Sequence, residues 1–264
     1  MMKEVRTIVL RVDGTNCDEE TVIAFEKAGS KVDLIHMNEL IRKEKSLEDY
    51  QVLCIPGGFA YGDDIAAGKI FAVLLKYKIS EDVEKFVEEG KLVIGICNGF
   101  QVLVKTGLLP ALEGTMKKQE ATLASNDIGF FQDRWIYMKH ENKGKCVFTR
   151  GIKDKIYIPV THGEGKFVAE RDVIRKLEEN DQVVFKYVDP DGNYSGFPWN
   201  PNGSFDNIAG ICNPDGNVFG LMPHPEKFIH KWMHPYWTRL NGLSDVGDGF
   251  AIFKNAVEFA KKKS

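Results

Sequence analysis

The chain has 264 residues, of which 43% are hydrophobic and 28% charged, and its formal net charge is −3. This composition is typical of a globular protein with a sizeable core, and it excludes disordered and fibrous classes. The only basic run is the terminal Lys261-Lys262-Lys263, so the charge pattern gives no reason to expect a nucleic-acid partner. No apolar run approaches the length of a membrane span, so we expect no membrane partner either.

Five cysteines occur, at positions 17, 54, 97, 146 and 212. They form no C-x-x-C pair and show no metal-ligand spacing, and an odd number fits a disulfide framework poorly. The amino terminus, MMKEVRTIVLRV, enters a strand-like run directly and is too short and too charged for a signal peptide. We therefore expect a reduced, cytoplasmic protein that holds no metal.

The first part of the chain alternates between strands and helices. Short β-branched or apolar runs predict strands at residues 7–12, 32–36, 51–55 and 91–96. Helical patterns lie between them, at residues 16–28, about 65–75 and 80–89. Asn16 followed by Glu19 resembles a capping box that opens the first helix. This alternation, with nearly all-apolar strands, is typical of a parallel sheet covered by helices on both faces.

After about Gly107 the pattern becomes richer in strands. Strand-like segments are predicted at residues 121–123, 130–140, 146–148, 156–159 and 182–188, with a helix at 172–180. The strands at 208–212 and 218–222 flank the turn sequence NPDGN, a strong hairpin signal, and a helix at about 248–262 ends the chain. No repeat or linker divides the sequence. We expect residues 1–264 to form one α/β domain with a mostly parallel central sheet, helices on both faces and a β-rich excursion.

The stretch Gly95-Ile96-Cys97-Asn98-Gly99 directly follows an apolar strand. G-x-C-x-G in this context has the form of a nucleophile elbow, in which glycines let strand and helix approach while the middle side chain points outward. At the start of a helix, Cys97 would face the positive end of the helix dipole, which favours the thiolate. The backbone N–H of Asn98 would be free to bind an oxyanion. A structural cysteine is the ordinary alternative for this fragment taken alone.

A candidate base occurs in Met222-Pro223-His224-Pro225-Glu226, after the strand at 218–222. Residues two apart in an extended segment face the same side, so His224 and Glu226 can meet. A carboxylate that accepts from one ring nitrogen fixes the tautomer and leaves the other nitrogen to face a thiol. Each residue alone would be interpreted as a loop residue. With an elbow cysteine elsewhere, a catalytic triad is the favoured interpretation.

A second oxyanion donor is available in Pro56-Gly57-Gly58-Phe59, which leaves the strand at 51–55. Glycine lets backbone N–H groups approach a ligand, and loops at the carboxyl ends of parallel strands gather where ligands bind. The alternative is a tight turn that needs positive φ.

GICNGFQ and the later HPE resemble the class I (triad) glutamine amidotransferases, which are cysteine hydrolases on a flavodoxin-like α/β sheet. DGTNCDEE, PGGFAYGDD, THGEGKF, NPNGS and IAGICNPDGNVFGLMPHPE are similar to one group within that family, the glutaminase subunits of phosphoribosylformylglycinamidine synthases. The resemblance extends from Val9 to Lys227. Asp13 stands where many members have proline, and the aromatic segment 228–247, part of the extended C-terminal segment 228–264, is longer than in compact members. The aromatic side chains of segment 228–247 could belong to the core, to a lid or to a contact with another subunit.

The resemblance implies a role for each residue of the triad. Cys97 would be the nucleophile, His224 the general base and acid, and Glu226 the residue that orients the imidazole. Attack on the side-chain amide of glutamine would give a γ-glutamyl thioester and release ammonia, and water would then free glutamate.

The resemblance further implies that Gly58 and Asn98 supply the oxyanion hole and that Gln101 helps to hold the substrate glutamine. Ammonia would pass to a large synthase subunit that uses ATP and Mg²⁺ to convert formylglycinamide ribonucleotide (FGAR) to the amidine (FGAM) in purine biosynthesis. A small third subunit would bridge the two. The string from Gly62 to Ile70 is not a P-loop, because it has one residue too many and no Ser or Thr after the lysine. We therefore expect no cofactor on this chain.

Two other interpretations stay open, a free-standing cysteine hydrolase or peptidase of similar fold and a non-catalytic binding protein. One peptidase group places histidine directly after the elbow cysteine, where this chain has Asn98. Cys17 is a rival thiol, but it lacks flanking glycines and a facing base, so it ranks below Cys97. His162 and Glu164, in THGEGKF, are expected either to line the site or partner face or to be structural.

Overall fold

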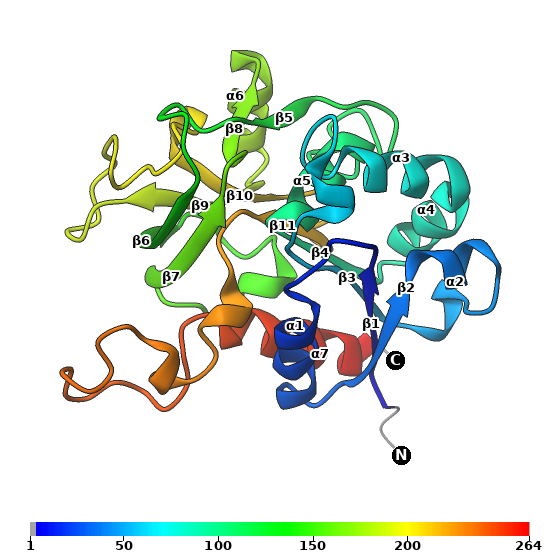
Figure 1. Ribbon diagram of the computed structural model, residues 1–264, viewed down its shortest axis with the longest axis horizontal. Coiled ribbons are helices and arrows are strands. Elements are labelled where there is room, and N and C mark those ends of the chain that lie inside the picture. The colour runs from blue at the N-terminus through cyan, green and yellow to red at the C-terminus, as the bar shows by residue number, and fades with distance from the viewer. Residues whose placement is uncertain (1–3, 264) are drawn as a thin grey trace.

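The computed structural model describes residues 4–263, and Figure 1 shows a central sheet with helices on both faces. Within these residues the large sheet has nine strands in the order β2-β1-β3-β4-β11-β10-β9-β6-β7. Their bounds are β1 Arg6–Arg11, β2 Lys31–His36, β3 Val52–Ile55, β4 Leu92–Ile96, β6 Gln132–His140, β7 Lys155–His162, β9 Val183–Val188, β10 Ile208–Cys212 and β11 Val218–Leu221. A separate antiparallel pair consists of β5 Ala121–Ala124 and β8 Lys166–Ala169.

Most strands of the large sheet point the same way. The five neighbours β2, β1, β3, β4 and β11 pair in parallel. Strands β10 and β6 are reversed, and β9 and β7 return to the first direction because each pairs antiparallel with a reversed neighbour. This confirms the mostly parallel sheet, the hairpin of β10 with β11 and the β-rich excursion. The carboxyl ends of β3, β4, β7 and β11 therefore all point toward one edge of the sheet, where ligands bind in such folds.

Helices cover both faces of the sheet. The α-helices are α1 Asp18–Lys27, α2 Met37–Ile41, α3 Lys69–Lys78, α4 Ser80–Glu88, α5 Asn98–Thr106, α6 Arg171–Glu179 and α7 Phe250–Lys263. The short 3₁₀ helices are η1 Leu47–Asp49, η2 Ala60–Asp63, η3 Val147–Thr149, η4 Phe205–Asn207, η5 Pro225–Lys227 and η6 Lys231–Met233.

In Figure 1, α1 and α7 lie together on one side of the sheet and α3 and α5 on the other. Phe25 of α1 meets Phe253 of α7 edge to face, with ring centroids 5.0 Å apart. Because both faces are covered, β4 is buried along its whole length, which its apolar sequence allows. None of the helices within residues 4–263 combines the length and apolarity needed to cross a membrane.

The predicted start of the first helix is wrong by one residue. Cys17, not Asn16, occupies the N-cap of α1, and its side chain makes no capping hydrogen bond. The reason is tertiary: the turn before α1 is bound to the loop after β3 through Cys17 N–H to Gly57 O, at 3.2 Å. The acidic first turn of α1, Asp18 to Glu20, is favourable at the positive end of the helix dipole.

Two other predictions need correction. Residues 146–148 are not a strand, because Asn142 Oδ1 accepts from the Cys146 N–H at 2.9 Å and η3 follows. Ile65 is not on a helix; it has φ +70° and is 83% exposed, and α3 begins only at Lys69.

Candidate active site

Cys97 lies on a sharp turn between β4 and α5. Its backbone has φ +51° and ψ −105°, which a non-glycine residue adopts only at a cost of about 1–3 kcal/mol. The turn is held by two hydrogen bonds, from Cys97 N–H to Leu221 O at 2.8 Å and from Gln101 N–H to Cys97 O at 3.1 Å. The thiol is therefore displayed at the carboxyl edge of the sheet, at the N-terminus of α5.

The two glycines around Cys97 are required by close packing. A Cβ atom at Gly95 would lie 2.6 Å from the carbonyl carbon of Gly99, and one at Gly99 would lie 1.9 Å from Ile55 O. Strand β4, helix α5 and the end of β3 thus meet without any side chain between them. This contact brings the loop after β3 to the elbow.

His224 and Glu226 follow β11 and are both buried. His224 Nδ1 lies 2.5 Å from Glu226 Oε1, so the carboxylate accepts from this nitrogen and directs Nε2 away from it. The backbone N–H of His224 donates to Pro159 O of β7 at 2.9 Å, which anchors the segment across the end of the sheet. The thiols of Cys97 and Cys17 both lie near enough to the imidazole to raise its pKa. The three residues predicted from two distant motifs are brought together.

Thr161, near the end of β7, is a member of the site that the sequence analysis missed. Its Oγ1 lies 3.1 Å from His224 Nε2, and its carbonyl oxygen lies 3.6 Å from Cys97 Sγ. The only local signal was a hydroxyl at the carboxyl end of a strand, next to the noted His162. Thr161 therefore contacts both the thiol and the imidazole.

The surroundings of His224 favour its charged form. Burial by itself lowers the pKa of the imidazole, but the Glu226 carboxylate and the Cys97 and Cys17 sulfurs outweigh burial and raise this pKa well above its ordinary value. A protonated imidazole at this position can give its proton to a leaving group beside Cys97. The resting site is thus suited to hold an imidazolium next to the nucleophile.

The loop that contains Gly58 is joined to the turn before α1. Phe59 N–H donates to Gly14 O at 2.8 Å, and Gly58 pairs with Thr15 as an isolated bridge. Gly58 has φ +145°, and a Cβ there would lie 2.7 Å from Asn16 N, so only glycine fits. As the first residue of α5, Asn98 has no preceding helical carbonyl for its N–H. The arrangement leaves Asn98 N–H available to an oxyanion.

The side chains of Asn98 and Gln101 belong to a polar network beside the elbow. Asn98 Nδ2 donates to Asp63 Oδ1 and to Gln101 Oε1, each at 2.9 Å, and Gln101 Nε2 donates to Glu164 O at 2.5 Å. Glu164 Oε2 in turn accepts from Ala67 N–H at 3.1 Å. Partial burial raises the pKa of Asp63 despite these donors. The network ties α5 to the loops on both sides of it.

His162 points into the protein and not toward the nucleophile. Its Nδ1 lies 3.2 Å from Asn126 Oδ1 and its Nε2 lies 3.4 Å from Asn202 Nδ2. Burial, and then the nearby His224, lower the pKa of His162 to about 3. A neutral ring that donates to Asn126 and accepts from Asn202 satisfies both contacts. The structural alternative for His162 is therefore the one supported.

Cys17 is closer to the site than predicted. Its Sγ, a ring nitrogen of His224 and a carboxylate oxygen of Glu226 all lie within 4.8 Å of one another. The expectation that Cys17 has no facing base is wrong, because the hydrogen bond of its N–H to Gly57 O draws it toward the segment that carries His224.

The aromatic segment 228–247 is divided between core and surface. Phe228 and Ile229 are buried, and His234 packs among Trp135, Tyr157 and Phe228, with ring centroids 5.5–5.6 Å from its own. Several of its other apolar side chains are exposed, namely Trp232, Tyr236, Trp237 and Leu240. In Figure 1 the segment lies away from α5 and the elbow.

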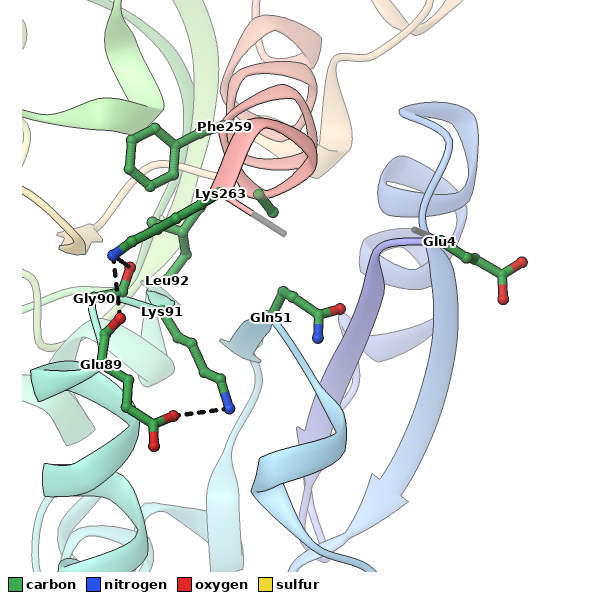
Figure 2. Close-up of a pocket in the computed structure, with 9 residues that line it drawn as sticks. Glu4, Gln51, Glu89, Gly90, Lys91, Leu92, Phe259 and Lys263 are labelled. Carbon is green, nitrogen blue, oxygen red and sulfur yellow. Dashed lines mark hydrogen bonds and ion pairs between the residues drawn. The ribbon is translucent and has the colours of Figure 1, made fainter. Parts of the chain in front are cut away.

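A cavity of about 340 Å³ lies at the amino ends of β3 and β4, on the sheet edge opposite Cys97. Figure 2 shows how its two lysines are held: Lys263 Nζ donates to the backbone oxygens Glu89 O and Gly90 O at 3.1 Å, and Lys91 pairs with the Glu89 carboxylate at 3.1 Å. It contains neither a thiol nor an imidazole, so it offers nothing to the chemistry of the elbow.

The fold and the elbow, imidazole and carboxylate define a cysteine amidotransferase architecture, and comparison with known proteins shows the family. Residues 4–260 match the model of the CobB/CobQ-like glutamine amidotransferase domain, and the chain belongs to this family. It is 48% identical over 263 residues to a phosphoribosylformylglycinamidine synthase subunit PurQ of Dehalococcoides mccartyi, covering 99% of this chain and 100% of the relative. It is 43% identical to the PurQ subunit of Archaeoglobus fulgidus, with 98% of each chain covered.

A solved structure shows the same relationship in three dimensions. A chain of PurLQS from Thermotoga maritima superposes with a TM-score of 0.74 at 32% identity, covering 97% of this chain and 99% of that one. The predicted flavodoxin-like glutamine amidotransferase fold is thereby confirmed.

Proposed function

We propose that this chain is the glutaminase subunit of phosphoribosylformylglycinamidine synthase. It hydrolyses glutamine and delivers ammonia to a synthase subunit that converts FGAR to FGAM with ATP and Mg²⁺. Full-length similarity to PurQ subunits supports this assignment, and the observation that carries it is the buried His224–Glu226 pair, which Thr161 links to the thiol of an elbow cysteine.

The site supports a two-step mechanism on Cys97. The thiolate attacks the side-chain amide carbon of glutamine, while Gly58 and Asn98 N–H groups stabilise the oxyanion. His224, oriented by Glu226, gives its proton to the departing ammonia, and a γ-glutamyl thioester forms. His224 then takes a proton from water, which attacks the thioester and releases glutamate and the thiolate. In this proposal Gln101, whose side chain is bound to Asn98 and to Glu164, helps to hold the substrate glutamine.

The partners proposed are the large synthase subunit and the small bridging subunit, because a neighbouring structure is that of a PurLQS assembly. Phe59, directly after Gly58, is 43% exposed and stacks on the exposed Phe131 at 6.2 Å. This aromatic pair is suited to a subunit contact beside the site. ATP and Mg²⁺ belong to the synthase subunit in this proposal, and this chain carries no cofactor of its own.

The match over residues 4–260 supports a single glutamine amidotransferase domain, predicted for 1–264, of which residues 1–3 and 264 lie outside the described part. Cys17, Cys54, Cys97, Cys146 and Cys212 are all free, which supports a reducing, cytoplasmic setting.

A glutamine analogue with a chloroketone group tests the assignment. It is expected to add once per chain, at Cys97, as seen by intact-mass and peptide mass spectrometry. In the complex assembled with the two partner subunits, Cys97→Ala should abolish glutamine-dependent amidine synthesis and leave ammonia-dependent synthesis intact. Glutamine-dependent turnover by that variant would overturn the proposal.

A further inference from the structure

Cys17, His224 and Glu226 form a compact group of three different ligand types. One ligand atom from each lies within 4.8 Å of the other two, and all three residues are buried. Their sequence positions gave no metal-ligand spacing, because they come from the turn before α1 and from the segment after β11. The fold alone brings them together.

One further observation shows unused ligand capacity in this group, and another shows how closely the group is packed. Glu226 is completely buried, and its Oε2 has no hydrogen-bond partner among the described residues, although its Oε1 faces His224 Nδ1. Gly57 closes the group from the side of β3 without a side chain. A Cβ there would lie 2.6 Å from His224 Cε1 and 3.4 Å from Cys17 Sγ. An unsatisfied buried carboxylate oxygen is costly and is suited to bind a cation.

We propose that Cys17, His224 and Glu226 bind one thiophilic divalent cation of the Zn²⁺ class. Thiolate, imidazole and carboxylate are the ligands that Zn²⁺ takes in proteins, with bonds of about 2.0–2.3 Å. A sulfur ligand selects Zn²⁺ or Cd²⁺ over Mg²⁺. The separation of His224 Nδ1 and Glu226 Oε1, now 2.5 Å, must open by about 1 Å to admit the ion.

The charges in the group balance when the ion binds. The Cys17 thiol and Nδ1 of the His224 imidazolium each lose a proton, so a thiolate and the Glu226 carboxylate neutralise the two charges of the cation while the imidazole binds as a neutral ligand. The half-buried Lys227 lies near the Cys17 sulfur and the Glu226 carboxylate, and its positive charge opposes binding of the cation. Lys227 is itself paired with Glu20, at 3.1 Å. The site is therefore expected to bind reversibly, not as a permanent structural centre.

Binding at Nδ1 would switch off the imidazole. The ring proton then resides on Nε2, the nitrogen that faces Thr161, so Nε2 can no longer accept a proton. Cation binding thus inhibits glutamine hydrolysis without touching Cys97; this consequence rests on the proposed function, whereas binding itself does not.

Cadmium provides a direct test with the full-length, metal-free chain. Cd²⁺ is titrated into wild type, Cys97→Ser and Cys17→Ser while the ultraviolet thiolate-to-Cd²⁺ charge-transfer band is recorded. We expect saturation at one ion per chain in wild type and Cys97→Ser, competition by Zn²⁺ but not by Mg²⁺, and at least about 100-fold weaker binding in Cys17→Ser. Cys146 and Cys212 also lie next to each other, but the contact with Cys146, and then burial, raise the pKa of the Cys212 thiol, so this pair is not expected to bind Cd²⁺; both thiols are present in all three proteins.

The outcomes separate this site from the nucleophile. If Cys97→Ser loses the band and Cys17→Ser keeps it, the ion binds at the nucleophile and the proposal is wrong. Equal binding by all three proteins would likewise overturn it. Denaturant unfolding checks that Cys17→Ser is folded, and Glu226→Gln serves as a second ligand removal if it is not. Because no step uses glutamine, the result does not depend on the glutaminase assay.

Discussion

The hydroxyl of Thr161 lies 3.1 Å from Nε2 of His224, on the side of the ring opposite to Glu226. The imidazole is therefore held between a carboxylate at Nδ1 and a hydroxyl at Nε2. The carbonyl of Thr161 also lies 3.6 Å from Cys97 Sγ. Strand β7 thus aligns the proton donor with the nucleophile, although it lies at the far edge of the sheet order.

Replacing Thr161 by Val removes the hydroxyl and keeps the β-branched shape. We expect glutamine-dependent turnover in the assembled enzyme to fall about 10-fold, because one hydrogen bond to a charged group contributes about 1.5 kcal/mol. Steady-state kinetics with glutamine and with ammonia check this, since the ammonia-dependent rate should not change. Thr161→Ser, which keeps the hydroxyl, should stay within about twofold of wild type. Equal rates for Val and wild type would show that the hydroxyl has no role.

Glu226→Gln keeps the size of the side chain and removes its charge. The charge of Glu226 is the main factor that raises the pKa of His224 against burial, so the variant should lose most of its imidazolium. We expect glutamine-dependent turnover to fall about 10²- to 10⁴-fold, the usual contribution of acid–base catalysis. The measurement is again the ratio of glutamine- to ammonia-dependent synthesis. A variant with wild-type turnover would show that Glu226 is not the orienting residue.

The same pKa shift predicts how stability depends on pH. The folded pKa of His224 is raised, so the stabilisation is fully present below the ordinary value near 6.5 and is lost as the pH rises through the folded value. The free energy of unfolding of wild type should therefore fall as the pH increases above about 6.5. Denaturant unfolding across this range should show a shallower fall for Glu226→Gln, whereas Thr161→Ser should follow wild type. If the free energy of unfolding fell with pH equally in wild type and Glu226→Gln, the assignment of His224 and Glu226 as an ion pair would be contradicted.

The contribution of His162 to the free energy of unfolding has the opposite pH dependence. Its folded pKa, about 3, lies below the unfolded value near 6.5, so the unfolded chain binds a proton first as the pH falls. Its neutral form stabilises the fold above pH 6.5, and this contribution is lost at about 1.4 kcal/mol per pH unit between about 6.5 and 3. Denaturant unfolding should show a shallower acid decline for His162→Gln than for wild type. An identical acid slope in the two proteins would mean that His162 is not buried in its neutral form.

The parts of the site that could be predicted from the sequence are those that are local in the chain. Cys97 is recognisable because its strand and glycines are its immediate neighbours, and His224 and Glu226 because two-residue spacing places them on one side. Thr161 and Cys17 could not be assigned in this way. Their positions depend on the return of β7 to the active edge and on backbone pairing between the turn before α1 and the Gly57–Gly58 loop.

The same distinction explains the errors in the fold. The parallel strands and the hairpin of β10 with β11 follow from composition and turn residues over a few positions. The start of α1 and the 3₁₀ helix at Val147–Thr149 are decided by hydrogen bonds to Gly57 and Asn142, whose partners a propensity pattern does not show.

Gly99→Ala tests whether the elbow depends on close backbone packing. The added Cβ would lie 1.9 Å from Ile55 O, a main-chain atom of β3 that cannot move without displacing the loop of Gly58. We expect a loss of about 3 kcal/mol or more in the free energy of unfolding, the range of severe overpacking, together with loss of single-site labelling of Cys97 by the chloroketone analogue. Gly196→Ala is the matched control, because a Cβ at Gly196 meets no atom within 4 Å, and it should unfold within about 0.5 kcal/mol of wild type. Wild-type stability and labelling in Gly99→Ala would show that β3 and α5 can separate at the elbow, and the close approach would then not be what displays the thiol.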